Sequence, residues 1–362
     1  MTISLSVCRR LLLVAPLLLA LLTGCAGSGQ APVAEAEEDR GPLIEATAAL
    51  TAHVEGEAEL TSEQIKAHTQ TINDHAQALA ENEAALKAAQ TFIRTYDRTL
   101  GPLYVNTPLL HKKKKDPAHA IHWAAFWVMQ NVLDQVYNDE GLATWREQLE
   151  GFRFGTADYF PGKVQQPVTD GPYTVKIQAS YPETWGAPMF HMERPARKPT
   201  GAYLKPGDIA TVTVPPALVD KGYQVRVGAH SWDLTRKPKT NRLHRVTTLY
   251  DIDDTEVEVA NPLGGGIYIE VPYKADGGGV VEVTVENAAR SPYFSWKDFH
   301  RTTLEQWRET ERHFKAPWAD FQTDKFMMQV PTSWIYELDD PAPLMEDWDR
   351  SMDVMNDLMG RP

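Results

Sequence analysis

The chain has 362 residues, of which 43% are hydrophobic, 23% are charged and 9% are aromatic, and its formal net charge is −13. This composition excludes a collagen, a disordered chain and a polytopic membrane protein, and the length suggests two or three domains. The acidic balance argues against a dedicated nucleic-acid binder, which needs a concentrated basic face. Both cysteines lie within the first 25 residues, so a disulfide framework and a cysteine-ligated zinc site are excluded as well.

The first segment is predicted to be a targeting signal. Two arginines precede an apolar run at residues 11–22, which is too short to span a bilayer as a helix but has the length typical of a secretion signal. The run ends in Leu-Thr-Gly-Cys, which resembles the bacterial lipobox, where cleavage before the cysteine is followed by its acylation. We predict a signal peptide over 1–24 and lipidation of Cys25, with an ordinary signal peptide as the alternative. Ala26 after the cysteine favours an outer-membrane lipoprotein that faces the periplasm or the cell surface.

Residues 25–42 are predicted to be a flexible tether, and residues 43–155 a helical spacer domain. Thr61 and Gln64 have the spacing of a capping box, and the Ala- and Glu-rich stretch that follows predicts one helix up to about residue 100. Apolar residues recur in that stretch at near-heptad spacing: Ile65, Ile72, Ala76, Leu79, Leu86 and Phe92. A second helical stretch is predicted from about residue 117 to 150.

Two histidine pairs and one lysine run in this region are candidates for chemistry. His68 and His75 are seven residues apart, and His119 and His122 are three apart, but neither pair has a third ligand at metal-binding spacing. Surface or packing roles are therefore favoured over metal binding. The lysine run at residues 112–115 is interpreted as a solvated loop rather than a nucleic-acid patch.

Residues 165–292 show short alternating segments that predict an antiparallel β-sandwich. The predicted strands are 173–177, 209–214, 223–227, 257–259, 266–271 and 280–285. Five residues here are candidate ligand contacts: His230, Trp232, Asp233, Gly265 and Tyr268. The first three follow a predicted strand. The glycines around Gly265 would permit close backbone approach to a ligand, although a tight turn before the next strand is the favoured interpretation.

The last segment, residues 293–362, returns to helical character. A short helix is predicted over 302–314, a strand over 325–330, and a final helix after Asp340 and Pro341, which suit its start. An apolar stripe runs along that helix: Leu344, Met345, Trp348, Met352, Met355, Leu358 and Met359. Core packing is the favoured role for this stripe. The same role is favoured over sugar stacking for the tryptophans of the segment: Trp296, Trp307, Trp318 and Trp334.

Six sequence blocks from the sandwich onward resemble one known family, in the same order. They are TGAYLKPG at 200–207, YQVRVGAH at 223–230, NPLGGGIYI at 261–269, SPYF at 291–294, APWAD at 316–320 and LMEDWD at 344–349. Together they resemble the enhancin-like, mucin-targeting zinc metallopeptidases of peptidase family M60. With the helical region, the resemblance predicts an α+β chain: helices, an antiparallel β-sandwich, and the start of a mixed α/β metallopeptidase catalytic lobe.

The resemblance implies that zinc is bound in the full-length family by a His-Glu-x-x-His helix, whose glutamate activates the zinc-bound water. None of the eleven histidines of this chain is followed by glutamate. We therefore assign no catalytic residue and no metal ligand, and expect no zinc to be bound by this chain. The segment 293–362 is predicted to be a truncated catalytic lobe, and the chain is predicted to be inactive alone.

The function predicted from the sequence is thus the N-terminal portion of a surface-anchored zinc metallopeptidase that acts on glycoproteins such as mucins. Its expected partners are the membrane, through the lipid anchor, and the glycoprotein substrate, with no nucleic acid. A non-catalytic lipoprotein that binds glycans or proteins through the β-sandwich is the alternative. A spacer or assembly protein, suggested by the heptad-like helical face, is a third hypothesis.

Overall fold

The computed structural model describes residues 41–113, 116–169, 171–182 and 194–360. The predicted signal peptide, Cys25 and nearly all of the predicted tether lie outside the described residues. The fold is α+β, as predicted, with helices before and after antiparallel sheets.

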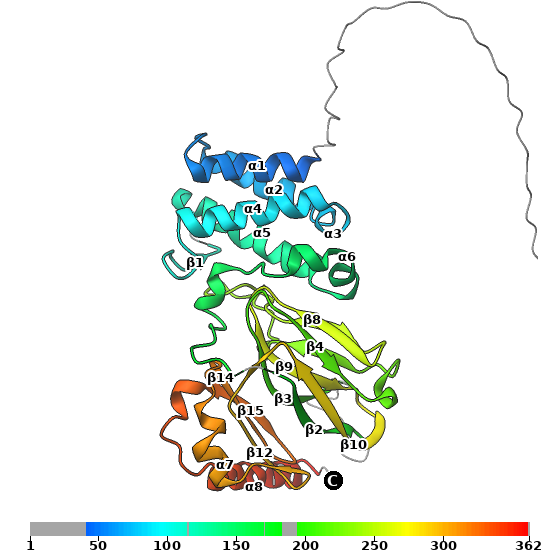
Figure 1. Cartoon of the computed structure of the whole chain (residues 1–362). Coiled ribbons are helices and arrows are strands. Elements are labelled where there is room, and N and C mark those ends of the chain that lie inside the picture. The colour runs from blue at the N-terminus through cyan, green and yellow to red at the C-terminus, as the bar shows by residue number, and fades with distance from the viewer. Residues whose placement is uncertain (1–40, 114–115, 170, 183–193, 361–362) are drawn as a thin grey trace, which may run out of the picture. The chain divides into compact units, whose positions relative to one another are not determined.

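The N-terminal part of the described chain is helical (Figure 1). Its elements are α1 (Pro42–Glu55), α2 (Ser62–Asp74), α3 (Ala78–Glu81), α4 (Glu83–Thr99), η1 (Pro117–His119), α5 (Ala120–Val136), α6 (Asp139–Leu149) and η2 (Gly155–Asp158). The predicted capping box is present at the start of α2, where Thr61 accepts a hydrogen bond from the Gln64 amide and the Gln64 side chain accepts one from the Thr61 amide. The near-heptad face is confirmed, because Ile65, Ile72 and Leu86 are buried.

The prediction of one helix up to residue 100 is wrong, whereas the helical stretch predicted over 117–150 is present but broken. The first stretch is divided into α2, α3 and α4, and the Asn82 side chain accepts hydrogen bonds from the amides of Ala84 and Ala85 at 2.8 and 3.2 Å. The second stretch is broken before α6, where the Asn138 side chain accepts from the Gly141 amide at 2.9 Å. Asparagine satisfies the free amides at a helix start, so each one begins a new helix inside a sequence that otherwise favours continuation.

Two antiparallel sheets form the predicted sandwich. One has the order β2 (Tyr173–Ser180), β10 (Asp276–Glu286), β4 (Ile209–Thr213) and β8 (Glu256–Ala260). The other has the order β11 (Ala289–Arg290), β3 (Ala196–Leu204), β9 (Gly265–Val271), β5 (Gln224–Val227) and β7 (Thr248–Asp251). Outside these sheets, the 3-10 helix η5 (Pro216–Leu218) follows β4, and β1 (Leu110–His111) pairs with β6 (Lys239–Thr240).

Strand β9 is buried along its whole length, although a sandwich strand usually has one solvated face. Ile267 and Ile269 belong to the main hydrophobic core. Tyr268 and Glu270 alternate with them and therefore point to the opposite side of the sheet, yet they are only 0% and 2% exposed. Tyr268 is hydrogen-bonded there to Asp320, so the C-terminal sheet covers this face of β9 at Tyr268, while Glu270 pairs with two arginines.

The C-terminal part has its own sheet and its own smaller core. The strand order is β13 (His300–Arg301), β12 (Tyr293–Lys297), β14 (Trp318–Gln322) and β15 (Met327–Pro331), and β12 and β14 run parallel. The remaining elements are α7 (Leu304–Glu309), η6 (Glu311–His313), η7 (Thr332–Trp334) and α8 (Ala342–Leu358). Trp307 of α7 is fully buried against Phe294 and Phe321, so α7 lies on this sheet (Figure 1).

Helix α8 places fully buried side chains against the sheet only in its first turn. Met345 is fully buried, and the Trp348 ring stacks on Phe326 at 5.0 Å between ring centroids. Toward the end of the helix the predicted apolar stripe is exposed, with 42% exposure for Met355 and 82% for Leu358. The structure therefore assigns core packing to only one end of the stripe.

The helices and the sandwich share one hydrophobic core. The fully buried Phe126 ring of α5 lies edge-on to His244 at 4.6 Å between centroids. The Gln130 side chain accepts a hydrogen bond from the Arg245 amide at 3.2 Å. The division into domains at 43–155, 165–292 and 293–362 remains a prediction. Among the helices that the structure describes, none has both the length and the apolar character that crossing a membrane requires.

Candidate functional site

The loop that follows β5 contains three of the five predicted ligand contacts. It starts at Gly228, whose backbone adopts a φ of +96°, and Gly265 at the start of β9 has a φ of +146°. A Cβ atom on Gly265 would lie 2.7 Å from the Gly228 Cα, which real side chains do not tolerate. The Gly228 amide donates to the Gly266 carbonyl at 2.8 Å. The glycine run thus lets two backbones of the sandwich approach each other.

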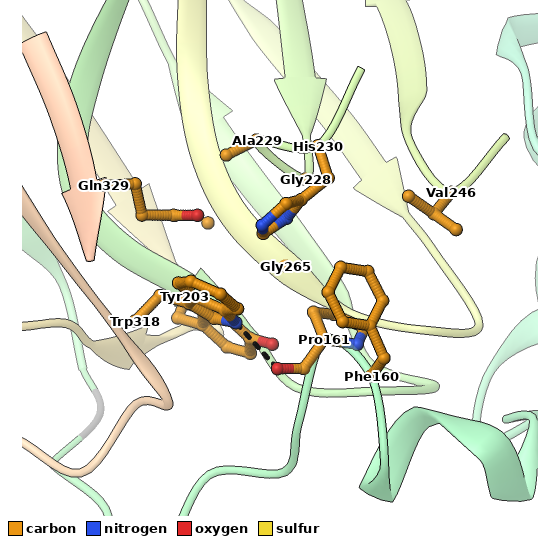
Figure 2. Close-up of a pocket in the computed structure, with 11 residues that line it drawn as sticks. Phe160, Pro161, Tyr203, Gly228, Ala229, His230, Val246, Gly265, Trp318 and Gln329 are labelled. Carbon is orange, nitrogen blue, oxygen red and sulfur yellow. Dashed lines mark hydrogen bonds between the residues drawn. The ribbon is translucent and has the colours of Figure 1, made fainter. Parts of the chain in front are cut away.

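His230 is packed between aromatic rings. Its ring lies edge-on to Phe160 and Trp318, at 4.7 and 4.6 Å between centroids, and the Trp318 indole donates to the Pro161 carbonyl at 2.7 Å (Figure 2). Burial, together with the nearby charges of Arg242 and Arg197, lowers the pKa of His230 to about 4. The imidazole is therefore neutral at pH 7, as suits a packing role.

A small cavity lies beside His230 (Figure 2). It is lined by Phe160, Pro161, Tyr203, Gly228, Ala229, His230, Val246, Gly265, Gly266, Trp318 and Gln329. Its volume of about 10 Å³ is close to what one water molecule needs. A sugar ring or a peptide does not fit, so the cavity is a packing defect where the segment before the sandwich, the sandwich and the C-terminal sheet meet.

Tyr268 belongs to a buried polar cluster behind this cavity. Its hydroxyl lies 3.0 and 3.2 Å from the two carboxylate oxygens of Asp320, and it accepts from the Gln329 amide group at 2.6 Å. Burial raises the pKa of Asp320 to about 7, although the Tyr268 hydrogen bond and the Arg197 charge lower it. This cluster joins β9 to β14 and β15, and it is covered by protein rather than open to a ligand.

Glu270 forms a second buried cluster on the same face of β9. Its carboxylate is 3% exposed and pairs with Arg197 at 3.1 Å and, more closely, with Arg226. The Arg197 guanidinium also lies over the Tyr268 ring, 5.6 Å from its centroid. Sequence reasoning missed Glu270 and Asp320, because the strand pattern reveals neither the arginines of β3 and β5 that pair with Glu270 nor the contact of Asp320 with Tyr268 of the sandwich.

Trp232 and Asp233 lie on the outer part of the loop. The Trp232 side chain is 75% exposed, while its carbonyl accepts a hydrogen bond from Arg242 at 2.9 Å. Asp233 pairs with Arg245 at 3.4 Å, and its hydrogen bonds to Thr235 lower its pKa. The five predicted contacts therefore do not converge: His230 and Gly265 line the small cavity, Tyr268 is buried, and only Trp232 offers an open side chain without a polar partner of its own.

The described residues include no group of three or more His, Cys, Asp or Glu side chains arranged to hold a metal ion. His119 and His122 lie 6.1 Å apart between ring centroids, and His122 is hydrogen-bonded to the Tyr96 hydroxyl at 2.6 Å. Burial lowers the pKa of His122. These contacts give the pair a packing role in the helical region.

Two family comparisons match consecutive parts of the chain. Residues 166–286 match the N-terminal domain of M60-like peptidases. Residues 287–362 match Peptidase M60, enhancin and enhancin-like. The boundary between the two matches falls between β10 and β11, just before the last strand of the sandwich.

A curated relative and two solved structures are similar to the chain. TRPM8 channel-associated factor 3 of Mus musculus is 30% identical over 196 residues, which are 54% of this chain and 20% of the relative. The IMPa metallopeptidase from Pseudomonas aeruginosa is 14% identical with a TM-score of 0.48, covering 79% of this chain and 30% of that one. A structure of IMPa from Pseudomonas aeruginosa in complex with an O-glycopeptide is 12% identical with a TM-score of 0.46, covering 83% and 31%. The matched part spans about a fifth of the curated relative's length.

Proposed function

Because residues 166–362 of this chain belong to the M60-like, enhancin-like peptidases, we propose that the chain is part of a surface-anchored zinc metallopeptidase. The proposed substrates of this enzyme are glycoproteins such as mucins. The observation that carries the proposal is the pair of consecutive family matches, which follow the fold from the sandwich into the C-terminal sheet. The surface location rests on the lipobox-like sequence before Cys25.

The zinc site of this proposed activity is not assigned to the residues described here. Among those residues no metal-binding cluster is present, and the whole sequence has no histidine followed by glutamate. The rings of His119 and His122 pack against each other, and His122 is hydrogen-bonded to the Tyr96 hydroxyl. The described residues therefore do not fit zinc, and no catalytic role is assigned to them. Their proposed contribution is the non-catalytic scaffold beside the reaction centre.

The proposal is tested on native and recombinant material side by side. An antibody against the 362-residue chain captures the protein from the cells that make it, and the captured material is incubated with mucin. We expect cleavage that a chelator abolishes and added zinc restores. Captured material that leaves mucin intact under all conditions would contradict the proposal.

The recombinant 362-residue chain is the matched control. We expect no cleavage from it, with or without zinc, because its described residues hold no metal-binding cluster and its sequence has no His-Glu-x-x-His motif. Chelator-sensitive cleavage by this chain alone would refute the assignment of no zinc ligand. Membrane attachment is tested separately with Cys25→Ser, which should move the protein from the membrane fraction to the soluble fraction if the cysteine is acylated.

A further inference from the structure

Basic residues gather on one surface of this acidic protein. Residues 231–245 contain five basic side chains and one acidic side chain, whereas the whole chain has 36 basic and 49 acidic residues. The pairing of β1 with β6 places His111 opposite Lys239, and the Lys112 amide donates to the Pro238 carbonyl at 3.0 Å. Lys112 is thereby joined to the loop. We call the resulting surface the basic corner; it consists of Lys112, Lys113, Trp232, Arg236, Lys237 and Lys239.

The charges of the basic corner are available to a ligand. All five of its basic residues are exposed. Among the described residues, none of them forms an ion pair, and the Lys112 ammonium group donates to the Thr235 carbonyl. The one acidic residue of the loop, Asp233, is paired with Arg245, which also binds Asp134. The exposed charge at this surface is therefore positive.

The basic corner is held in place by the fold beneath it. Arg245 donates from Nε to the Asp134 carboxylate of α5 at 3.0 Å. The Leu234 amide donates to the His244 carbonyl at 3.1 Å, and Arg242 holds the Trp232 carbonyl. Helix α5, the loop after β5 and the β1–β6 pair together hold the backbone that carries the charges. Because this backbone is already fixed, less conformational entropy is lost when a ligand binds.

The exposed indole identifies the class of ligand. Trp232 presents a flat apolar face of the kind on which a pyranose ring can stack, and lysine and arginine side chains pair with carboxylate or sulfate groups. A membrane surface would call for several exposed apolar anchors, but Trp232 is the single large one among residues 231–239, since Leu234 is half-buried. We propose that the basic corner binds sugar chains that carry carboxylate or sulfate groups, as part of the glycoprotein recognised by the proposed peptidase. This inference rests on the proposed function for the source of the sugar chain.

The test uses the full chain and three polymers with one backbone: dextran sulfate, carboxymethyl dextran and unmodified dextran. We expect binding to at least one of the charged dextrans, weakening as salt is added, and no binding to unmodified dextran. The charged polymer that binds more tightly identifies the preferred anion. Because no peptide bond is cleaved in this assay, its failure is distinguishable from a failure of the mucin-cleavage test.

Two variants locate the binding. The triple variant Arg236→Ala, Lys237→Ala, Lys239→Ala should weaken binding about tenfold, from three exposed charge contacts. Trp232→Ala should weaken it by about tenfold as well, while binding of inorganic polyphosphate, which has no ring to stack, should not change. An unchanged affinity of Trp232→Ala for the charged dextran would refute the sugar-binding role of the indole.

The matched control removes the same charge elsewhere, with Lys66→Ala, Lys87→Ala and Lys221→Ala. This variant should bind like the original chain, and an equal loss would overturn the proposal in favour of a general charge effect. Vesicles of phosphatidylcholine containing phosphatidylserine supply the last arm. The proposal is wrong if the original chain binds these vesicles more tightly than both charged dextrans and if only the basic-corner triple variant, not the control variant, fails to bind them. The surface would then recognise membranes.

Discussion

The Glu270 carboxylate is the negative charge that pairs with two largely buried guanidinium groups. Arg197 and Arg226 are 22% and 12% exposed, so neither is well hydrated if the carboxylate is removed. We expect Glu270→Gln to lower the free energy of unfolding by about 3–5 kcal/mol, the usual cost of breaking a buried pair from one side. Urea denaturation measures the loss.

The control for Glu270 is Glu258→Gln. Glu258 pairs with Arg146 at 3.0 Å, but the two side chains are 40% and 45% exposed. Solvent screens this pair, and we expect a loss below about 1 kcal/mol. Equal losses for the two variants would mean that burial does not strengthen the Glu270 cluster.

Asp320 makes stability depend on pH. Its pKa of about 7 lies above the value near 4 of an unfolded chain, so the folded state holds a proton that the unfolded state has released. This stabilising contribution is complete below about pH 4 and is lost as pH rises to about 7. Between pH 5 and pH 8 we expect the unfolding free energy to fall by about 2–3 kcal/mol on account of this residue.

Asp320→Asn tests that dependence. The amide oxygen still accepts from Tyr268, but the side chain has no proton to release. The variant should therefore gain stability over the original chain as pH rises from 5 to 8, measured by urea denaturation at both values. A difference between the two proteins that stays constant with pH would show that Asp320 is ionised throughout or protonated throughout.

At the residue scale, three ligand contacts were predicted because they follow a strand. One of them, Trp232, has an exposed side chain in the structure. The sequence could not identify Asp320 or Glu270, because the alternation of β9 gives Glu270 the position of a solvated side chain. Glu270 pairs with Arg197 and Arg226, and Asp320 contacts Tyr268, each more than forty positions away along the chain. No local pattern reports such long-range burial.

At the scale of elements, the capping box of α2 is a direct sequence-to-structure link. The Thr61 side chain accepts from the Gln64 amide at 3.3 Å, and the Thr61 amide donates back to the Gln64 side chain at 2.9 Å. We expect Thr61→Ala to cost about 1 kcal/mol of stability. Thr71→Ala on the same helix is the control, because the Thr71 hydroxyl donates only to the carbonyl one turn earlier. Thermal unfolding followed by circular dichroism should separate the two variants.

Strand β3 shows why some elements escaped prediction. It contains Pro199 and Gly201, residue types that are depleted in strands. Its pairing with β9 shifts register between Pro199 and Tyr203, and Gly201 has a φ of +71° within that irregularity. An interrupted strand loses the alternation by which strands are predicted. The uninterrupted strands β4, β5, β8 and β9 were predicted to within a residue or two.

At the scale of the whole molecule, the shared core predicts how the chain unfolds. Phe126, Gln130 and Asp134 of α5 all contact the segment 244–245 that leads into β7. We expect the helices and the sandwich to unfold in one transition, with circular dichroism and tryptophan fluorescence giving the same midpoint. Phe126→Ala should lower the common midpoint, since removing a buried phenylalanine ring costs about 3–5 kcal/mol. Two separate midpoints in the original chain would contradict this coupling.

The uneven burial of α8 has a consequence for oxidative chemistry. Met355 near the end of α8 and Met359 just after it are 42% and 55% exposed, whereas Met345 in the first turn is fully covered. Peroxide should therefore convert the two outer thioethers to sulfoxides first, without unfolding the chain, because those side chains already lie in water. The Met345 sulfur should react only when the helix detaches from its sheet. Peptide mass spectrometry after timed peroxide exposure would thus record how often α8 separates from the rest of the protein.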